Sequence, residues 1–312
     1  MLVIKDFTVM LSLRPDDIAE IWGQFRNAFD GTARRNDGTG KDTFYESKFG
    51  VIACVTDVLD SHQKLVSQLG ERFISYRMPR LSEHERFRRT TKAAEGDSLT
   101  ARRSALRSAA MKVLASHPSP AVMFPDAEKQ LVLMAEFLAS ARTWVPRNRQ
   151  HEIIALPDPE VPTRIVKQLA SLACGVAMAR GKSEVGQSEI NLMKHLAIDS
   201  IPVLRSRILE VTAAAGPDGI SVDETATKLA LAPLTVRYAF QDMRLLNILT
   251  TREVLTPNGI QKSFWILKPK YRSLWLEDEY VRHSEEEERV AWEILCEAQE
   301  RQRRLDPAAD GE

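Results

Sequence analysis

The residues best suited to chemistry lie together on one predicted helix near the C-terminal end of the sequence. Over residues 233–246 the apolar side chains recur at helical spacing, and they are Val236, Ala239, Phe240, Met243 and Leu246. The outward face of the same helix carries Thr235, Arg237, Tyr238, Gln241 and Arg244. Guanidinium, amide and hydroxyl groups on one helix face are the groups that contact base edges and phosphates in the DNA major groove. We therefore predict that this face binds double-stranded DNA.

Two further helices are predicted before this one, and the sequence marks their ends. A helix over 201–215 is followed by the helix-breaking Gly216. Ser221 and Glu224 then have the spacing of a capping box, in which each side chain bonds the backbone N–H of the other residue. Pro233 suits the first position of the third helix, because no N–H donor is needed there.

A β-hairpin is predicted after the third helix. Two β-type runs flank turn-forming residues at 257–259, and Lys262 lies beside that turn. Three helices followed by a hairpin predict a winged helix-turn-helix domain over 201–275, with Lys262 contacting DNA phosphates. The alternative role of such a domain is protein docking, and Asp242 on the third helix is expected to weaken its attraction for DNA.

Four other polar residues stand at ordered positions in the first 200 residues. Asp6 follows an apolar strand-like run, Thr56 follows a second one, Arg72 lies in the segment Leu69–Phe73, and Arg164 begins a predicted helix. In this order the segments resemble the Walker B strand, the sensor-one strand, the arginine-finger segment and the lid helix of AAA+ ATPases. The resemblance is to the minichromosome-maintenance type of helicase, whose members often end in a winged helix.

The resemblance implies a role for each of the four residues. Asp6 would be a Mg²⁺ ligand, Thr56 the sensor hydroxyl, Arg72 a finger that reaches a neighbouring subunit, and Arg164 the lid arginine that touches phosphate. Because a finger acts on its neighbour, Arg72 is expected at the edge of its domain and not in the core.

The same resemblance implies a domain order and one further DNA contact. Residues 1–80 would be the C-terminal part of an α/β AAA+ core, and residues 81–200 an all-α connector and lid. A hairpin would lie within residues 32–46, where basic side chains can follow a DNA backbone. The basic residues there are Arg34, Arg35 and Lys41.

The sequence departs from this family in two ways that concern ATP. Phe7 stands where the family has the glutamate that orients the attacking water, and no Gly-x-x-x-x-Gly-Lys-Ser/Thr loop occurs. We therefore expect no cofactor on the chain alone, and ATP with Mg²⁺ only if a P-loop half is supplied. The chain would then be a truncated half of a longer ATPase, one of two polypeptides, or a scaffold.

Composition limits the remaining function classes. Lys and Arg together number 43, as do Asp and Glu, so DNA binding would have to come from a local patch. Three scattered cysteines and the lack of a long apolar run predict a cytoplasmic protein without disulfides, zinc or membrane contact. Beyond residue 275, a serine and four glutamates predict a C-terminal helix within 276–312.

Two functions follow from these observations. The first is a helicase-like module of the replication type, as found in bacteria and mobile elements, whose winged helix docks on DNA. The second is a winged-helix transcriptional regulator whose N-terminal domain serves only for oligomerisation. The partners expected are double-stranded DNA and either further copies of the chain or an upstream P-loop half.

Overall fold

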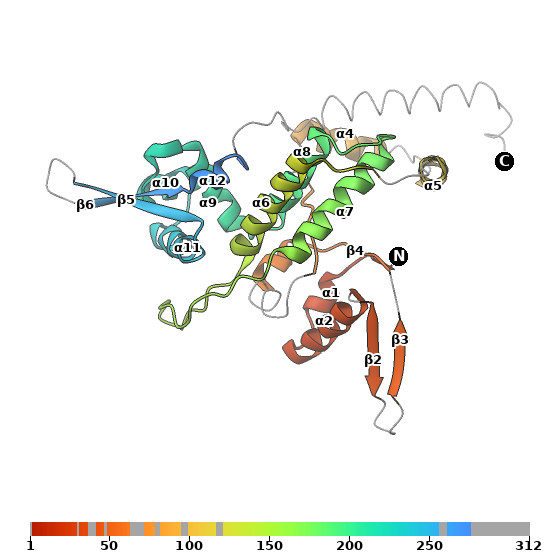
Figure 1. Cartoon of the computed structure of the whole chain (residues 1–312), viewed down its shortest axis with the longest axis horizontal. Helices are drawn as coiled ribbons and strands as arrows, with labels where there is room; N and C mark the ends of the chain where they lie inside the picture. The colour runs from red at the N-terminus through yellow and green to blue at the C-terminus, as the bar shows by residue number, and fades with distance from the viewer. Residues whose placement is uncertain are drawn as a thin grey trace. The chain divides into compact units, whose positions relative to one another are not determined.

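The computed structural model describes residues 2–29, 31–36, 42–46, 49–62, 72–78, 82–94, 99–116, 121–255 and 261–275. In these ranges the chain is a mixed α/β structure in which helices predominate and the strands form three two-stranded sheets (Figure 1). Contacts divide the chain into residues 1–274 and 275–312. The helix predicted within 276–312 lies outside the described residues.

The N-terminal region contains a parallel strand pair and an antiparallel hairpin. In the parallel pair Leu2 lies opposite Val51, and in the hairpin Arg34 lies opposite Phe44, so the hairpin expected within residues 32–46 is confirmed. The elements of this region are β1 (Leu2–Ile4), α1 (Thr8–Leu11), α2 (Pro15–Phe29), β2 (Thr32–Asn36), β3 (Asp42–Glu46), β4 (Val51–Ala53) and the 3₁₀ helix η1 (Asp57–His62).

An aromatic cluster holds this region together. Phe7, Leu11 and Trp22 are buried, and Phe25 and Phe73 pack against them. The ring centroid of Phe7 lies 5.1 Å from that of Trp22 and 6.1 Å from that of Phe73. Buried aromatic rings remove a large apolar area from water, so this cluster stabilises the region more than its two short parallel strands do.

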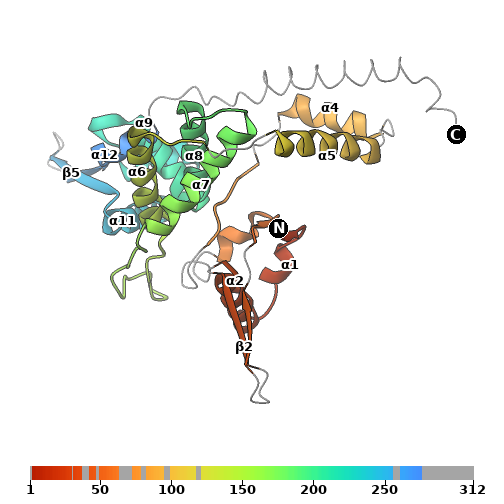
Figure 2. The same cartoon turned by 45° about the vertical axis from the view of Figure 1, so that its right-hand side comes forward.

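Three helices pack against one another in the middle of the chain (Figure 1 and Figure 2). They are α6 (Pro125–Arg142), α7 (Thr163–Ala179) and α8 (Gln187–Asp199). Each contributes fully buried side chains at helical spacing, namely Leu131, Phe137 and Leu138 from α6, Ile165 and Leu169 from α7, and Ile190 and Met193 from α8. The helices predicted here are confirmed, and their apolar stripes form the core.

The sequence from Phe73 to Met78 is a β-type run that predicts a strand. Residues 73–78 form no strand, so this prediction is wrong. Their backbone N–H groups bond side chains at the end of α8: Ser75 N donates to Ser200 Oγ (2.8 Å), and Arg77 N donates to Asp199 Oδ2 (2.8 Å). An apolar run shows that a segment is partly buried, but it does not show whether a neighbouring strand will take up the backbone hydrogen bonds.

Two basic helices, α4 (Glu83–Ala94) and α5 (Leu99–Ala115), precede this core. Lys and Arg outnumber Asp and Glu in both. Their described side chains are exposed except for those of Glu85 and Arg102, which are half-buried, and Phe87 is 72% exposed. The predicted basic helical connector is thus present, with little packing of its own.

The three helices and two strands predicted between residues 201 and 267 are confirmed to within two residues at each end, and they are α9 (Val203–Ala214), α10 (Val222–Leu229), α11 (Pro233–Leu245), β5 (Leu249–Leu255) and β6 (Gln261–Leu267). The structure adds two elements that the sequence did not predict, the 3₁₀ helix η2 (Gly216–Asp218) and α12 (Pro269–Arg272). The capping box is also present, because Glu224 N donates to Ser221 Oγ (3.3 Å) and Ser221 N donates to Glu224 Oε2 (2.9 Å).

The β5–β6 hairpin is attached to the helices in two ways. Ile220, just before α10, exchanges backbone hydrogen bonds of 3.0 and 2.8 Å with Trp265 of β6. The ring of Trp265 also stacks on Phe240 of α11, with centroids 4.8 Å apart and planes 6° apart. One strand residue thus fixes the hairpin to both α10 and α11.

Replacing Gly219 by alanine should break this attachment. Gly219 has φ 74° and ψ −178°, and an added Cβ would lie 2.7 Å from the Trp265 carbonyl oxygen. That backbone region is almost restricted to glycine, so we expect Gly219→Ala to lower the free energy of unfolding by about 2 kcal/mol or more in urea titrations. Gly216→Ala is the control, because φ is 64° there but nothing lies within 4 Å of the added carbon. Equal stability of the two variants would contradict this account.

Glu189 should make the stability of the α6–α8 core depend on pH. Its burial opposes ionisation, but hydrogen bonds from Lys182, Arg180 and neighbouring groups outweigh this and lower its pKa from 4.5 to about 2. Because the pKa is lower in the folded chain, the ionised group stabilises the fold above pH 4.5, and this contribution is lost as the pH falls toward 2.

We therefore expect Glu189→Gln to be less stable than the parent at neutral pH and to lose less stability between pH 4.5 and 2. Urea unfolding followed by circular dichroism at several pH values measures this. Asp126→Asn is the control, since that carboxylate is 89% exposed. A pH dependence in Glu189→Gln as steep as that of the parent would show that the buried carboxylate is not the cause.

Candidate nucleic-acid interface

Helix α11 separates its apolar and polar residues as the sequence predicts. Its apolar residues Val236, Ala239, Phe240 and Met243 are buried. Among the predicted DNA contacts on this helix, Thr235, Arg237 and Arg244 are exposed, whereas Tyr238 and Gln241 are half-buried. Arg237 and Arg244 are seven residues, or about two turns, apart, so they lie on the same side of the helix. Two cations are thereby presented to solvent in one row.

Asp242 does not weaken this helix in the way expected from the sequence. Its carboxylate accepts hydrogen bonds from Arg147 Nη2 (2.8 Å) and Arg205 Nη2 (3.4 Å). Burial lowers the pKa of Arg205, and the charge of Asp242 opposes that effect. With two guanidinium groups against one carboxylate, the negative charge on α11 is more than neutralised, so the expectation of a weakened field is corrected.

The half-burial of Tyr238 and Gln241 comes from residues 146–154, which we call the 146–154 hairpin. Arg147 Nη2 donates to Gln241 Oε1 (3.3 Å), and its guanidinium carbon lies 4.9 Å from the ring centroid of Tyr238. The ring of His151 stacks on Tyr238, with centroids 4.9 Å apart and planes 15° apart. A segment almost a hundred residues earlier in the chain therefore covers one flank of α11.

Lys262, the predicted phosphate contact of the β5–β6 hairpin, lies at a half-exposed position. Its ammonium nitrogen is 3.6 Å from Glu224 Oε1 and 5.3 Å from the ring centroid of Phe264. The carboxylate partner is 50% exposed, so this pair is weakly held and leaves the lysine able to exchange partners. The turn predicted at 257–259 lies outside the described residues.

The second predicted DNA contact is the β2–β3 hairpin. Arg34 and Arg35 lie next to each other in β2, opposite Phe44 and Thr43 of β3. Lys41 lies outside the described residues.

Asp6 and Thr56 meet at the carboxyl end of the β1–β4 pair. Asp6 Oδ1 accepts a hydrogen bond from the backbone N–H of Thr8 (3.0 Å). The Thr8 hydroxyl bonds the Thr56 hydroxyl (3.3 Å) and accepts from the Thr56 backbone N–H (3.2 Å). Both predicted residues are exposed, and Thr8 connects them. Thr8 carries no signal of this role in the sequence, because it acts through a residue 48 positions away.

Arg164 belongs to an ion-pair cluster between α6 and the start of α7. Both Arg142 and Arg164 donate to the carboxylate of Glu160, with 2.9 Å between Arg142 Nε and Glu160 Oε1. Arg142 is 5% exposed and Arg164 24% exposed in their side chains. One carboxylate thus faces two guanidinium groups, which leaves the cluster positive.

Arg72 lies close to the same helix but through its backbone. Gln168, one turn after Arg164 on α7, donates from Nε2 to the Arg72 carbonyl oxygen (2.5 Å). Arg72 itself is half-buried, and the next residue, Phe73, packs against Phe7. The residue after Asp6 and the residue after Arg72 are therefore in contact.

The residues present do not form a magnesium–nucleotide site by themselves. Within the ranges that the structure describes, no three side chains of His, Cys, Asp or Glu come together as a metal site. The sequence contains no phosphate-binding glycine loop, and Asp6 already accepts a backbone hydrogen bond.

No protein-family model matches the chain, and no curated protein matches it either. In the described part of the chain, every helix is too short or too polar to cross a lipid bilayer. Function is therefore inferred from the residues and contacts of this chain alone.

We expect the purified protein to hydrolyse no ATP above the buffer background and to bind no ATP in the presence of Mg²⁺. The reason is the missing set of phosphate ligands. Phosphate release and calorimetric titration measure the two properties, with Asp6→Ala as the matched variant. Turnover that Asp6→Ala abolishes would reveal a nucleotide site of another kind.

Proposed function

We propose that the chain is a DNA-binding protein whose residues 201–275 form a winged helix-turn-helix domain. The single observation that carries the proposal is the row of exposed arginines on α11, a helix whose opposite face is fixed in a core. In such domains the corresponding helix enters the major groove, and its polar face contacts the bases. The protein would act where the DNA is, in the cytoplasm.

The order and pairing of the elements support this assignment. Three helices, α9, α10 and α11, are followed by the β5–β6 hairpin. Ile220, between α9 and α10, pairs with β6 as a short additional strand. A hairpin beside the third helix is the arrangement in which a wing reaches the phosphate backbone.

Local charge supports the same assignment in a chain of zero formal net charge. Arg237, Arg244 and Lys262 contribute cations on α11 and β6, while Asp242 is paired within the protein. Lysine and arginine side chains are the groups that neutralise DNA phosphates.

For residues 1–200 we propose the C-terminal half of a AAA+ helicase-like ATPase that is inactive without a P-loop half. The contact between Asp6 and Thr56 through Thr8 supports this, because these residues end two adjacent parallel strands. The lack of a phosphate loop favours the second candidate, a transcriptional regulator in which this region serves for assembly with further copies.

Two substitutions should affect DNA binding in different ways. Arg237 lies in the first two turns of α11, where such helices meet base edges, so Arg237→Ala should cost about 1–3 kcal/mol at a preferred site and blur its sequence preference. Lys262→Ala should weaken all duplexes alike and reduce the slope of log affinity against log salt by about one.

Selection from a random duplex library by the full chain would supply the preferred site, and anisotropy titrations would give the affinities. Lys167→Ala, an exposed cation on α7, is the control variant. A folded protein that binds no duplex even at low salt would show that 201–275 is a protein-docking module.

A further inference from the structure

The 146–154 hairpin is internally braced and does not behave as an ordinary connecting loop. Ile154 N donates to the Pro146 carbonyl oxygen (3.1 Å), and Asn148 N donates to the Glu152 carbonyl oxygen (3.0 Å). Asn148 Nδ2 also donates to Glu152 Oε2 (2.8 Å), and the backbone N–H of Glu152 donates to Asn148 Oδ1 (2.8 Å). The segment therefore has a defined shape before anything binds to it.

His151 closes the turn of this hairpin in an uncommon backbone conformation. Its φ is 63°, and its N–H donates to the Asn148 carbonyl oxygen (3.0 Å). A residue other than glycine is held in this region when surrounding contacts specify it, and here the contact is the stacking of His151 on Tyr238. The strained residue is therefore also the one that anchors the turn on α11.

The hairpin occupies one flank of α11 and leaves the other open. Tyr238 and Asp242, which contact it, are four residues apart and share one side of the helix. Arg237 and Arg244 share another side and are exposed. Gln241 lies between the two rows and accepts from Arg147, so the hairpin ends where the exposed polar face begins.

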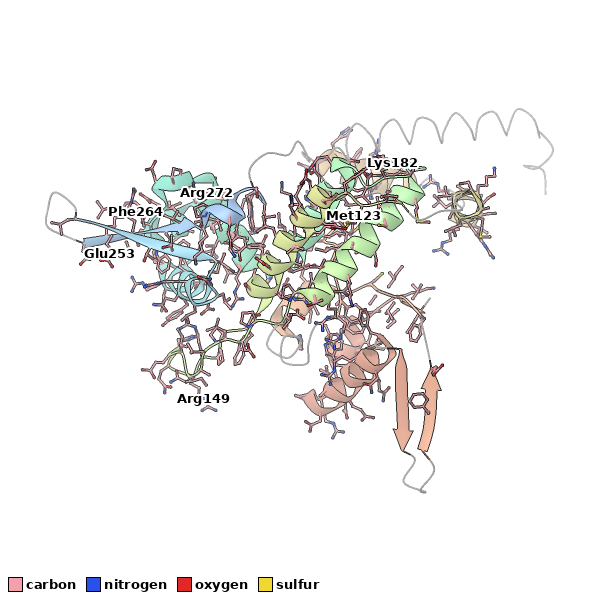
Figure 3. All side chains as sticks on the ribbon, viewed as in Figure 1. Met123, Arg149, Lys182, Glu253, Phe264 and Arg272 are labelled. Atoms are coloured by element: carbon pink, nitrogen blue, oxygen red, sulfur yellow. The ribbon has the colours of Figure 1, made fainter. Side chains whose placement is uncertain are left out.

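The outer end of the hairpin carries an exposed cation. Arg149 is exposed, and Figure 3 shows it at the outer end of this segment. Glu152, the acidic residue of the hairpin, is occupied by Asn148. Arg147 is committed to Asp242, which leaves Arg149 as the cation that the hairpin presents outward.

We propose that the 146–154 hairpin is a second DNA-contacting element, in which Arg149 binds a backbone phosphate beside the groove that α11 enters. The proposal rests on the DNA-binding function proposed above. Arg147 is a positioning residue here, because it fixes the hairpin on α11 and neutralises Asp242, a carboxylate that would otherwise repel the phosphates. Bracing the hairpin in advance avoids the entropy cost of ordering a loop on binding.

The first test removes the phosphate contact alone. For the full chain on a fluorescein-labelled duplex, Arg149→Ala should lower affinity about 3- to 10-fold at low salt and reduce the salt slope by about one. Arg149→Lys should keep most of the slope, and Lys167→Ala is the control for loss of a cation elsewhere.

The outcomes separate the two proposals. If the parent chain binds duplex and Arg149→Ala binds with the same affinity and slope, the hairpin is not a contact element and the proposal fails. Tighter binding by Arg149→Ala would also overturn it and would make the hairpin a cover that blocks α11. A parent chain that binds no duplex at low salt removes the DNA-binding function itself, and this inference with it.

The second test addresses the positioning role of Arg147. Arg147→Gln should weaken DNA binding, since it leaves Asp242 only the longer contact with Arg205 (3.4 Å) and releases the hairpin. Adding Asp242→Asn in the same chain should restore much of the affinity, a rescue that lost packing would not produce. Thermal unfolding of each variant checks the fold. No rescue in a folded double variant would contradict the role of Arg147.

Discussion

The pairing of Asp242 with Arg147 and Arg205 is the constraint on which the arrangement around α11 depends. It connects three elements, since Arg147 belongs to the 146–154 hairpin, Arg205 to α9 and Asp242 to α11. Arg205 also donates to the carbonyl oxygens of Ala141 (2.9 Å) and Thr143 (2.6 Å) at the end of α6. The pairing is costly to break, because Arg205 is buried and loss of Asp242 would leave its guanidinium without a carboxylate partner. The helix with the exposed arginines is thereby held to the helical core.

Local patterns in the sequence predicted most of the elements but few of the contacts between them. Apolar spacing and the capping box predicted α9, α10 and α11, and two β-type runs on either side of a turn predicted β5 and β6. These signals act within one or two turns of chain, where periodicity reports the buried face directly. The same local patterns also predicted that Arg237 and Arg244 point outward, and both are exposed in the structure.

The contacts that sequence reasoning missed are long-range. Arg147 and Asp242 are 95 residues apart, and nothing in the proline-rich surroundings of Arg147 distinguishes it from a surface arginine. Residues 73–78 show the converse case, in which a β-type run was wrongly assigned to a sheet. Its hydrogen-bond partners, Asp199 and Ser200, lie more than a hundred residues away. For Arg72 and Arg164, order along the chain predicted neither the contact of the Arg72 carbonyl oxygen with Gln168 nor the pairing of Arg164 with Glu160.

The exposure of α4 and α5 has a consequence for how the chain responds to thermal fluctuation. Helices of this length in water are marginal on their own, and most helices in proteins gain their stability from a packed apolar face. Because nearly all described side chains of α4 and α5 face solvent, little tertiary packing opposes their opening. Their backbone amides should therefore exchange with solvent deuterium through local opening. The free energy of this opening should be a small fraction of the opening free energy in α6, α7 and α8. We therefore expect α4 and α5 to melt and re-form while α6, α7 and α8 stay intact.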